Sequence, residues 1–169
     1  MKMFLLITVA IVCTVSGRYI ADTYRKRVLL LEKTEVMISI IRDEIRFYAL
    51  PINELLNLLS EKDALKQLKF IGRCKSLVSD GYEFPEAWKK ALKDRDCTAY
   101  FKRKDIDLLL DFGEHLGVTD TTGQLSNCEV YLEFIRFNLN EAKKEREQYS
   151  GIITVLGFLS GIALIIVLI

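Results

Sequence analysis

Apolar residues recur at helical intervals along most of this chain. The first regular stripe, which belongs to a long helix, consists of Leu31, Ile38, Ile41, Ile45 and Tyr48. We expect this helix to end before Pro51, because a proline pushes the preceding residue out of the helical conformation. Shorter apolar stripes predict two further helices, one through residues 55–59 and one starting at Asp63, which would act as its cap. The second of these stripes consists of Leu65, Leu68, Ile71, Cys74 and Val78.

Turn and helix-start signals divide the middle of the chain. The pair Asp80-Gly81 is typical of a turn. Phe84-Pro85 predicts the start of a helix with proline in its first turn. We expect irregular structure over residues 93–101, followed by a helix from about Lys104. The apolar side of that helix consists of Ile106, Leu109, Leu110 and Phe112.

The stretch 112–124 predicts a helix end followed at once by a helix start, and we call it the elbow. Gly117 is placed to end the first helix in a left-handed conformation, because glycine has no Cβ that would clash there. Thr121 and Gln124 have the spacing of a capping box, in which each side chain accepts a backbone N–H near the other. Asp120 is an alternative cap, and it would shift the start of the helix by a residue.

The longest regular pattern follows the elbow and consists of Leu125, Cys128, Leu132, Ile135, Leu139 and Ala142. Its strict three- and four-residue steps predict a helix that continues through Tyr149, since no proline or glycine occurs before Gly151. Two long helices with shorter ones between them predict an all-α, antiparallel helical bundle. An intermolecular coiled coil through the same stripe is the alternative. The presence of other helices to pack against favours the bundle.

Both ends of the chain are apolar. Residues 151–169 contain no charged residue and predict a C-terminal transmembrane helix, since about 20 residues cross a hydrocarbon core of about 30 Å. The N-terminal run is shorter, but residues 1–21 suffice for a transmembrane segment if Arg18 extends to the interface. A cleaved signal peptide is the alternative, and the lack of an A-x-A cleavage site favours the uncleaved anchor. Gly157 and Gly161 form a GxxxG pattern, which predicts close packing against the first span or another copy.

Basic residues beside the apolar segments set the expected topology. Those that follow the first segment or precede the last are Arg18, Arg25, Lys26, Arg27, Lys143, Lys144 and Arg146. The positive-inside rule therefore places the part between the spans in the cytoplasm and both termini outside. The predicted organisation is an N-terminal transmembrane segment (1–21), a cytoplasmic helical-bundle domain (22–150) and a C-terminal transmembrane helix (151–169).

Composition and motifs narrow the classes of function. The chain has 24 Lys and Arg against 23 Asp and Glu, so its charge gives no support to nucleic acid as a partner. The one histidine, His115, has only acidic residues nearby, which predicts no metal site. A Cys–His nucleophile pair has no local signature, and no nucleotide-binding or hydrolase motif occurs, so we expect neither a cofactor nor enzyme activity. Four scattered cysteines indicate a reducing compartment rather than a disulfide framework.

The helix that enters the elbow carries an acidic face. Like charges at helical spacing repel one another by about 0.2–0.5 kcal/mol per pair, so a basic partner would relieve them. Solvent, neighbouring basic residues of the chain and a second protein are the alternatives. This face and the elbow give our candidate interaction and structural residues, namely Asp107, Asp111, Glu114, Gly117, Thr119, Asp120 and Gln124.

The apolar ends, the basic segment, the helical middle and the elbow together resemble the stage III sporulation protein AB family. The most specific part of the resemblance is the family's Leu-Gly…Leu-Gly-x-[Ser/Thr]-Asp…Gln stretch. It stands here as Phe112-Gly113, Leu116-Gly117, Thr119-Asp120 and Gln124. Phe112 departs from the leucine of the family, which changes packing rather than the elbow. The pair Ala87-Trp88 matches an Ala-Trp of the family.

The resemblance implies a role in endospore formation, within a secretion-like channel complex that joins mother cell and forespore. The family is similar to the cytoplasmic domains of inner-membrane platform proteins in type II secretion and type IV pilus systems. It thus implies a non-enzymatic platform subunit in the mother-cell membrane. The implied partners are a secretion-type ATPase of the same sporulation system, other channel subunits, the lipid bilayer and further copies of the chain. A membrane-anchored helical signalling or scaffold protein is the alternative function.

Overall fold

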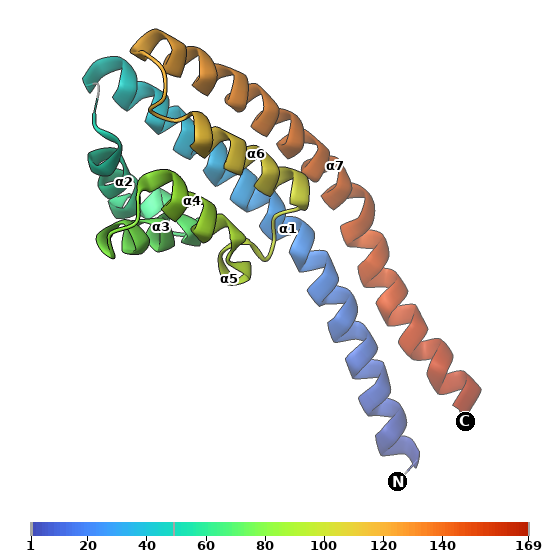
Figure 1. Ribbon diagram of the computed structural model, residues 1–169. Helices are drawn as coiled ribbons and strands as arrows, with labels where there is room; N and C mark the ends of the chain where they lie inside the picture. The colour runs from blue at the N-terminus through green and yellow to red at the C-terminus, as the bar shows by residue number, and fades with distance from the viewer. Residues whose placement is uncertain (1, 49, 169) are drawn as a thin grey trace. The chain divides into compact units, whose positions relative to one another are not determined.

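The computed structural model describes the backbone of residues 2–48 and 50–168, and the side chains in these ranges except at 2–14, 16–17, 150, 153–154, 156–158 and 160–168. Every regular element in the described residues is a helix (Figure 1), which confirms the all-α prediction. In chain order the elements are α1 (Lys2–Tyr48), α2 (Ile52–Glu61), the short 3₁₀ helix η1 (Asp63–Leu65), α3 (Lys69–Ser79), α4 (Phe84–Lys93), α5 (Arg95–Thr98), α6 (Arg103–His115) and α7 (Thr121–Leu168).

The chain forms two compact units. Unit 1 consists of its two ends, Met1–Val28 and Asn140–Ile169, and unit 2 of Leu29–Leu139. The long helices α1 and α7 therefore each contribute to both units. The domain boundaries at residues 21 and 150 concern membrane insertion, and they stay predictions.

In unit 2, the second half of α1 and the first half of α7 run antiparallel. Arg136 of α7 forms an ion pair with Glu35 of α1 at 2.7 Å. Arg46, closer to the C-terminal end of α1, pairs with Glu129 of α7 at 3.5 Å. Because the partner positions advance in opposite directions along the two helices, these pairs confirm antiparallel packing for this part of the bundle.

The apolar stripe of α7 lies inside the bundle. Cys128, Leu132 and Ile135 are at most 2% exposed in unit 2. Side chains that fill the core of their own chain are not available for an intermolecular coiled coil. The internal bundle is therefore the correct alternative for these three residues.

Asp105, at the start of α6, is fully buried and joins α6 to α7. One carboxylate oxygen accepts the backbone N–H of Lys102 at 3.0 Å, which fixes the first turn of α6. The other accepts the side-chain amide of Asn138 on α7 at 3.0 Å. A buried carboxylate is tolerated only where donors of this kind replace water, so this contact fixes the position of α6 along α7.

Trp88 of α4 is the centre of the packing among α3, α4 and α6. Its indole N–H donates to the backbone carbonyl of Leu109 at 2.8 Å. Its ring lies 5.2 Å from that of Phe70 on α3, edge to face, and 6.4 Å from that of Phe112 on α6. Gly113 faces the indole directly, and a Cβ at this position would overlap the ring. The missing side chain at 113 is what allows α4 and α6 to approach.

Two of the predictions about where helices occur are wrong. Asp63 does not cap a long helix, because the chain forms only η1 there and Leu68, with φ −82° and ψ 75°, interrupts the helix before α3 begins at Lys69. The segment 93–101, predicted irregular, contains the single turn α5. Asp94 caps this turn by accepting the backbone N–H of Asp96 at 3.0 Å.

The predicted helix start at Phe84-Pro85 is confirmed, since α4 begins at Phe84 with proline in its first turn. The predicted turn at Asp80-Gly81 is confirmed as well. Gly81 has φ 96°, and its N–H bonds to the carbonyl of Val78 at 3.0 Å. The predicted helix over residues 55–59 corresponds to α2.

Among the described residues, no helix offers a stretch that is both long enough and apolar enough to cross a membrane. Most side chains of the predicted spans at 1–21 and 151–169 fall outside the described residues. The same is true of Gly157 and Gly161, so their predicted packing role stays a prediction.

The contact between Trp88 and Gly113 gives a matched pair of glycine variants. We expect Gly113→Ala to lower the free energy of unfolding by about 1–3 kcal/mol, because its Cβ forces the buried indole to move. Gly72, in the exposed part of α3, has no atom within 4 Å of a built Cβ. Gly72→Ala should therefore raise stability by about 0.5–1 kcal/mol through helix propensity. Urea unfolding of the full-length chain in detergent measures both, and equal effects would contradict the packing role of Gly113.

Candidate functional site

The first half of the elbow ends α6. The N–H of Leu116 bonds to the carbonyl of Phe112 at 3.1 Å, and the N–H of Val118 to that of His115 at 3.4 Å. Between them Gly117 has φ 82°, which confirms the predicted left-handed end of the helix. A Cβ at Gly117 would also overlap the side chain of Ile52, at the start of α2. Sequence reasoning missed this contact, because nothing local to the elbow indicates that α2 reaches it.

The second half of the elbow starts α7, and Asp120 is its cap. The Asp120 carboxylate accepts the backbone N–H of Gly123 at 3.0 Å. The predicted capping box of Thr121 and Gln124 is wrong, because Thr121 is already the first residue of the helix. Gln124 instead donates its side-chain amide to the carbonyl of Thr119 at 2.9 Å. This hydrogen bond joins the first turn of α7 to the loop before it.

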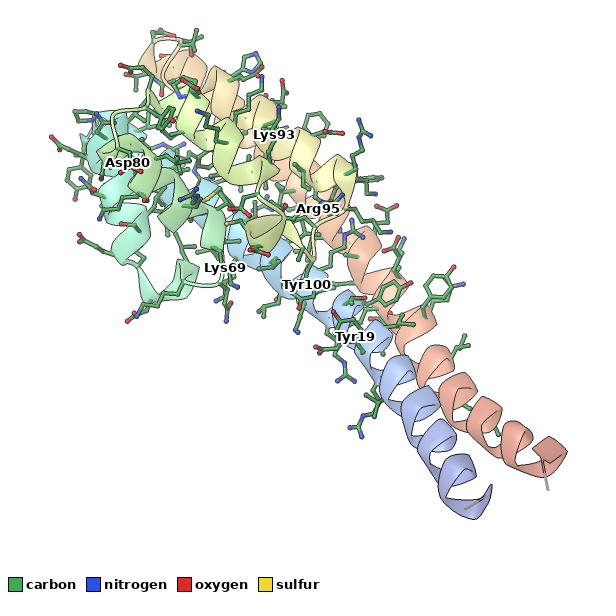
Figure 2. All side chains as sticks on the ribbon, turned by 60° about the horizontal axis from the view of Figure 1, so that its bottom comes forward. Tyr19, Lys69, Asp80, Lys93, Arg95 and Tyr100 are labelled. Atoms are coloured by element: carbon green, nitrogen blue, oxygen red, sulfur yellow. The ribbon has the colours of Figure 1, made fainter. Side chains whose placement is uncertain are left out.

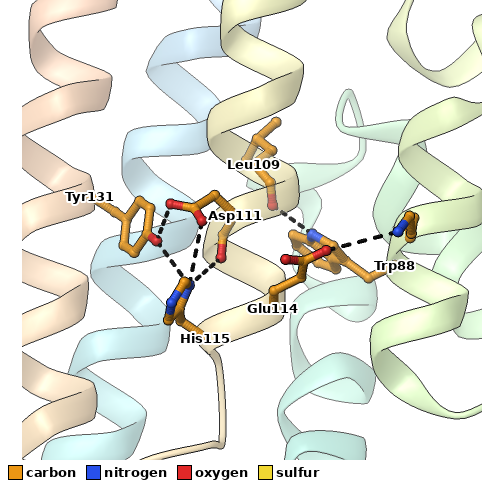
Figure 3. A network of polar contacts seen from close by, with 7 residues as sticks. Trp88, Leu109, Asp111, Glu114, His115 and Tyr131 are labelled. Carbon is orange, nitrogen blue, oxygen red and sulfur yellow. Dashed lines mark hydrogen bonds and ion pairs between the residues drawn. The ribbon is translucent and has the colours of Figure 1, made fainter.

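The acidic face of α6 has partners inside unit 2 (Figure 3). Asp107 lies 3.8 Å from Arg103, one turn earlier on α6. Glu114 lies 3.9 Å from Lys89 of α4. These are long, exposed ion pairs, and pairs of this kind contribute roughly 0–1 kcal/mol. They relieve repulsion along α6, as expected for basic residues of the same chain.

Asp111 makes the shortest contact of this face. The hydroxyl of Tyr131 on α7 donates to its carboxylate at 2.6 Å. His115 lies beside the pair, with its Nδ1 2.9 Å from the Asp111 carbonyl oxygen and 3.3 Å from the Tyr131 hydroxyl (Figure 3). The three side chains join the last turn of α6 to α7. Tyr131 was missed from sequence because it lies beside the regular apolar stripe rather than in it.

The chemistry of this group is that of a structural contact. Burial raises the pKa of Tyr131, and the hydrogen bond to the Asp111 carboxylate raises it further. The phenol therefore keeps its proton and serves as a donor. The space beside this group is too small to admit a water molecule, so it offers no room for a substrate. It lies among Phe112, His115, Gln124, Cys128 and Tyr131.

The cysteines of unit 2 are not activated nucleophiles. Burial raises the pKa of Cys128, which borders the same space as His115, to about 11. Burial likewise raises the pKa of Cys74 to about 12. A thiol reacts as its thiolate, so both groups are inert near neutral pH. Among the residues that the structure describes, no three metal-ligating side chains converge on one point.

Comparison with known proteins decides the family. The sequence model of stage III sporulation protein AB matches residues 2–169. The chain belongs to the stage III sporulation protein AB family. A relative, the stage III sporulation protein AB of Bacillus subtilis (strain 168), is 21% identical over 169 residues that cover 99% of each chain. No solved structure matches this chain.

Membership in this family supports a role in sporulation and confirms the resemblance carried by the elbow motif. Within that motif, Gly117 provides the left-handed residue and Asp120 the cap. Phe112, the departure from the family's leucine, is buried and packs edge to face on Tyr131 at 5.2 Å.

Two glycines with positive φ separate backbone strain from steric overlap. Gly117→Ala and Gly81→Ala both force a left-handed alanine, which costs roughly 1–2 kcal/mol. Only Gly117→Ala also overlaps Ile52, since the surroundings of Gly81 are open. We therefore expect Gly117→Ala to lower the melting temperature of the full-length chain more than Gly81→Ala does. Equal losses would show that Ile52 of α2 does not contact position 117 closely.

Substitutions at neighbouring residues test the cap of α7. Asp120→Ala should lower the free energy of unfolding by about 1 kcal/mol, because the N–H of Gly123 loses its acceptor. Asp120→Asn should lose less, since asparagine also caps helices. Thr121→Ala is the control and should leave stability within about 0.5 kcal/mol of the original. Urea unfolding measures all three, and a loss at Thr121 equal to that at Asp120 would refute the assignment.

Proposed function

We propose that this protein is a non-enzymatic membrane platform subunit of a secretion-like channel complex between mother cell and forespore. In this role it docks a cytosolic, secretion-type ATPase and is required for endospore formation. The family relationship supports the setting in sporulation. The observation that carries the mechanical part is the unbroken helix α7, which runs from the elbow at Thr121 to Leu168 in the apolar end.

Backbone hydrogen bonds from each residue to the fourth residue before it hold a helix together along its length. In the proposed role, α7 carries a displacement at the elbow towards the apolar end of the chain. The helix α1 is also continuous, from Lys2 to Tyr48.

Within unit 1, α1 and α7 are fastened to each other. Arg27 of α1 and Glu145 of α7 form an ion pair at 2.7 Å, with 4% and 19% of their side chains exposed. Tyr24 and Tyr149 stack beside them at 5.9 Å between ring centroids. This pairing supports a role in which the two ends act together as one anchor.

The proposed anchor is a membrane hairpin. Residues 1–21 and 151–169 are its two spans, and the basic residues beside them favour a cytoplasmic location for residues 22–150. Both termini then lie outside the mother cell, and unit 2 lies on the side where an ATPase has access to nucleotide.

Reporter fusions test the topology. We expect a reporter inserted at residue 60 to show cytoplasmic activity and one fused after Ile169 to show external activity. A cytoplasmic reporter at both positions would contradict the two-span hairpin.

Direct coupling is tested separately, by co-purifying the full-length chain in nanodiscs with the purified ATPase of the same sporulation system. Empty nanodiscs are the control, and no binding at micromolar concentration would contradict direct docking.

A further inference from the structure

Unit 2 has an open groove where the chain passes from α1 to α2 and from α3 to α4. Its volume is about 480 Å³, within the range of roughly 300–1,000 Å³ typical of ligand pockets. The groove lies at the end of unit 2 where α1 finishes, whereas α1 enters the unit at Leu29 and α7 leaves it at Leu139. Its lining consists of Pro51, Ile52, Asn53, Val78, Gly81, Tyr82, Glu83, Phe84 and Pro85.

The lining of the groove exposes polar and apolar surface in similar amounts, and two of its residues are rigid prolines. Further apolar side chains are exposed in parts of the chain that adjoin its lining residues. Phe47 and Tyr48, shortly before Pro51, are 71% and 70% exposed. Val118 of the elbow is also 71% exposed, and the contact between Gly117 and Ile52 brings the elbow to the groove wall. Exposed apolar side chains that gather at a hollow indicate an interaction site.

Three exposed carboxylates line the groove or stand next to its lining residues in the sequence. Glu83 lines it, and Glu54 and Asp80 directly follow or precede the lining residues Asn53 and Gly81. All three are exposed, and none has a hydrogen bond or ion pair from its side chain to a described residue. Lys90 also approaches the groove, 3.6 Å over the ring of Tyr82. Its charge is already matched by Glu86 at 2.9 Å.

Most other exposed carboxylates of unit 2 do have partners. The pairs include Glu61–Lys75, Asp63–Lys66, Glu86–Lys90, Asp107–Arg103, Glu114–Lys89 and Glu129–Arg46. The three carboxylates on or next to the groove lining thus lack the ion pairs that most others have among the described residues. Asp80 closes the end of α3 on this side, whereas the basic Lys69 begins the same helix at its other end (Figure 2).

We propose that this groove is the docking site for a basic segment of the cytosolic partner, in which an apolar side chain is flanked by lysine or arginine. The proposal rests on the platform role and assigns the face of unit 2 that the partner meets. The apolar side chain enters between Ile52 and Tyr82, and the flanking cations pair with Glu54, Asp80 and Glu83. Complementary charges around an apolar anchor give both orientation and fast association.

Charge opposes a symmetric contact between two copies of the chain through this face. A symmetric contact between two copies would bring the same three carboxylates of each copy together. Like charges in apposition oppose such a contact. A basic segment would instead be attracted by these carboxylates, so charge favours a basic segment of the partner as the occupant.

Matched variants separate the groove from the rest of the surface. Tyr82→Ala removes an apolar wall, and Glu83→Lys reverses one charge of the rim without removing a helix cap, because the Glu83 side chain caps nothing. The controls are Phe137→Ala and Glu133→Lys on α7, an exposed aromatic residue and an exposed carboxylate that do not line this groove. Unchanged melting temperatures verify the fold of all four variants.

Binding is measured on the full-length chain in nanodiscs of zwitterionic lipid with two probes. The first is a short labelled peptide of leucines among lysines, compared with the same peptide carrying glutamates. We expect the basic peptide to bind, more weakly as salt rises, and each groove variant to weaken it by about tenfold or more. The controls should change it by less than about twofold. Equal binding of both peptides, or equal effects of groove and control variants, would overturn the proposal.

The second probe is the purified secretion-type ATPase, and it separates the two proposals. If the ATPase binds the original chain and loses about tenfold or more with the groove variants alone, the docking site is supported. If it binds the original chain and all variants alike, the groove assignment fails while the platform role stands. If it fails to bind the original chain although the basic peptide binds in the groove, direct docking of this ATPase fails, and the groove keeps its preference for a basic segment.

Discussion

The indole of Trp88 occupies the space that a side chain at position 113 would need, and the packing of unit 2 depends on this close contact. The ring fills the gap left by the glycine and satisfies its N–H on the backbone of the same helix. From there aromatic contacts continue through Phe112 to Tyr131 on α7. Three helices are thus held by rings in contact, which are stiff and lose little conformational freedom when buried. Phe112, the first residue of the elbow, belongs to this series of ring contacts. The packing of the core therefore fixes where the elbow begins.

Periodicity alone predicted most of the helices. The stripes of α1, α6 and α7 are long enough that the helical period is unmistakable, and glycine at 117 has a local reason to be left-handed. Starts of short helices were less predictable. At Asp63 the sequence offers a good cap, yet the chain turns again at Leu68 before α3 begins. At the elbow two adjacent residues have capping side chains, and only the three-dimensional path selects Asp120.

Contacts between distant segments were not predictable from one sequence. The acidic face of α6 suggested a missing partner, but its carboxylates find Arg103, Lys89 and Tyr131 once the helices are assembled. Conversely, Glu54, Asp80 and Glu83 are unremarkable in sequence, since each stands alone near the end of a helix or turn. They become of interest only because residues of α2 and of the turn between α3 and α4 line the same groove. These spatial relations place our proposed docking site at the groove, and the candidate interaction residues on α6 stay a prediction.

The ion pair of Arg27 with Glu145 has a consequence for how force would pass along the two long helices. Sliding one helix past the other by a turn would separate two charges that are mostly shielded from water, and losing a partner in such a setting costs roughly 3–5 kcal/mol. The stacked rings of Tyr24 and Tyr149 would part in the same step. Within unit 1, this contact therefore opposes a sliding motion of α7 past α1. The parts of the two helices around it are expected to move together.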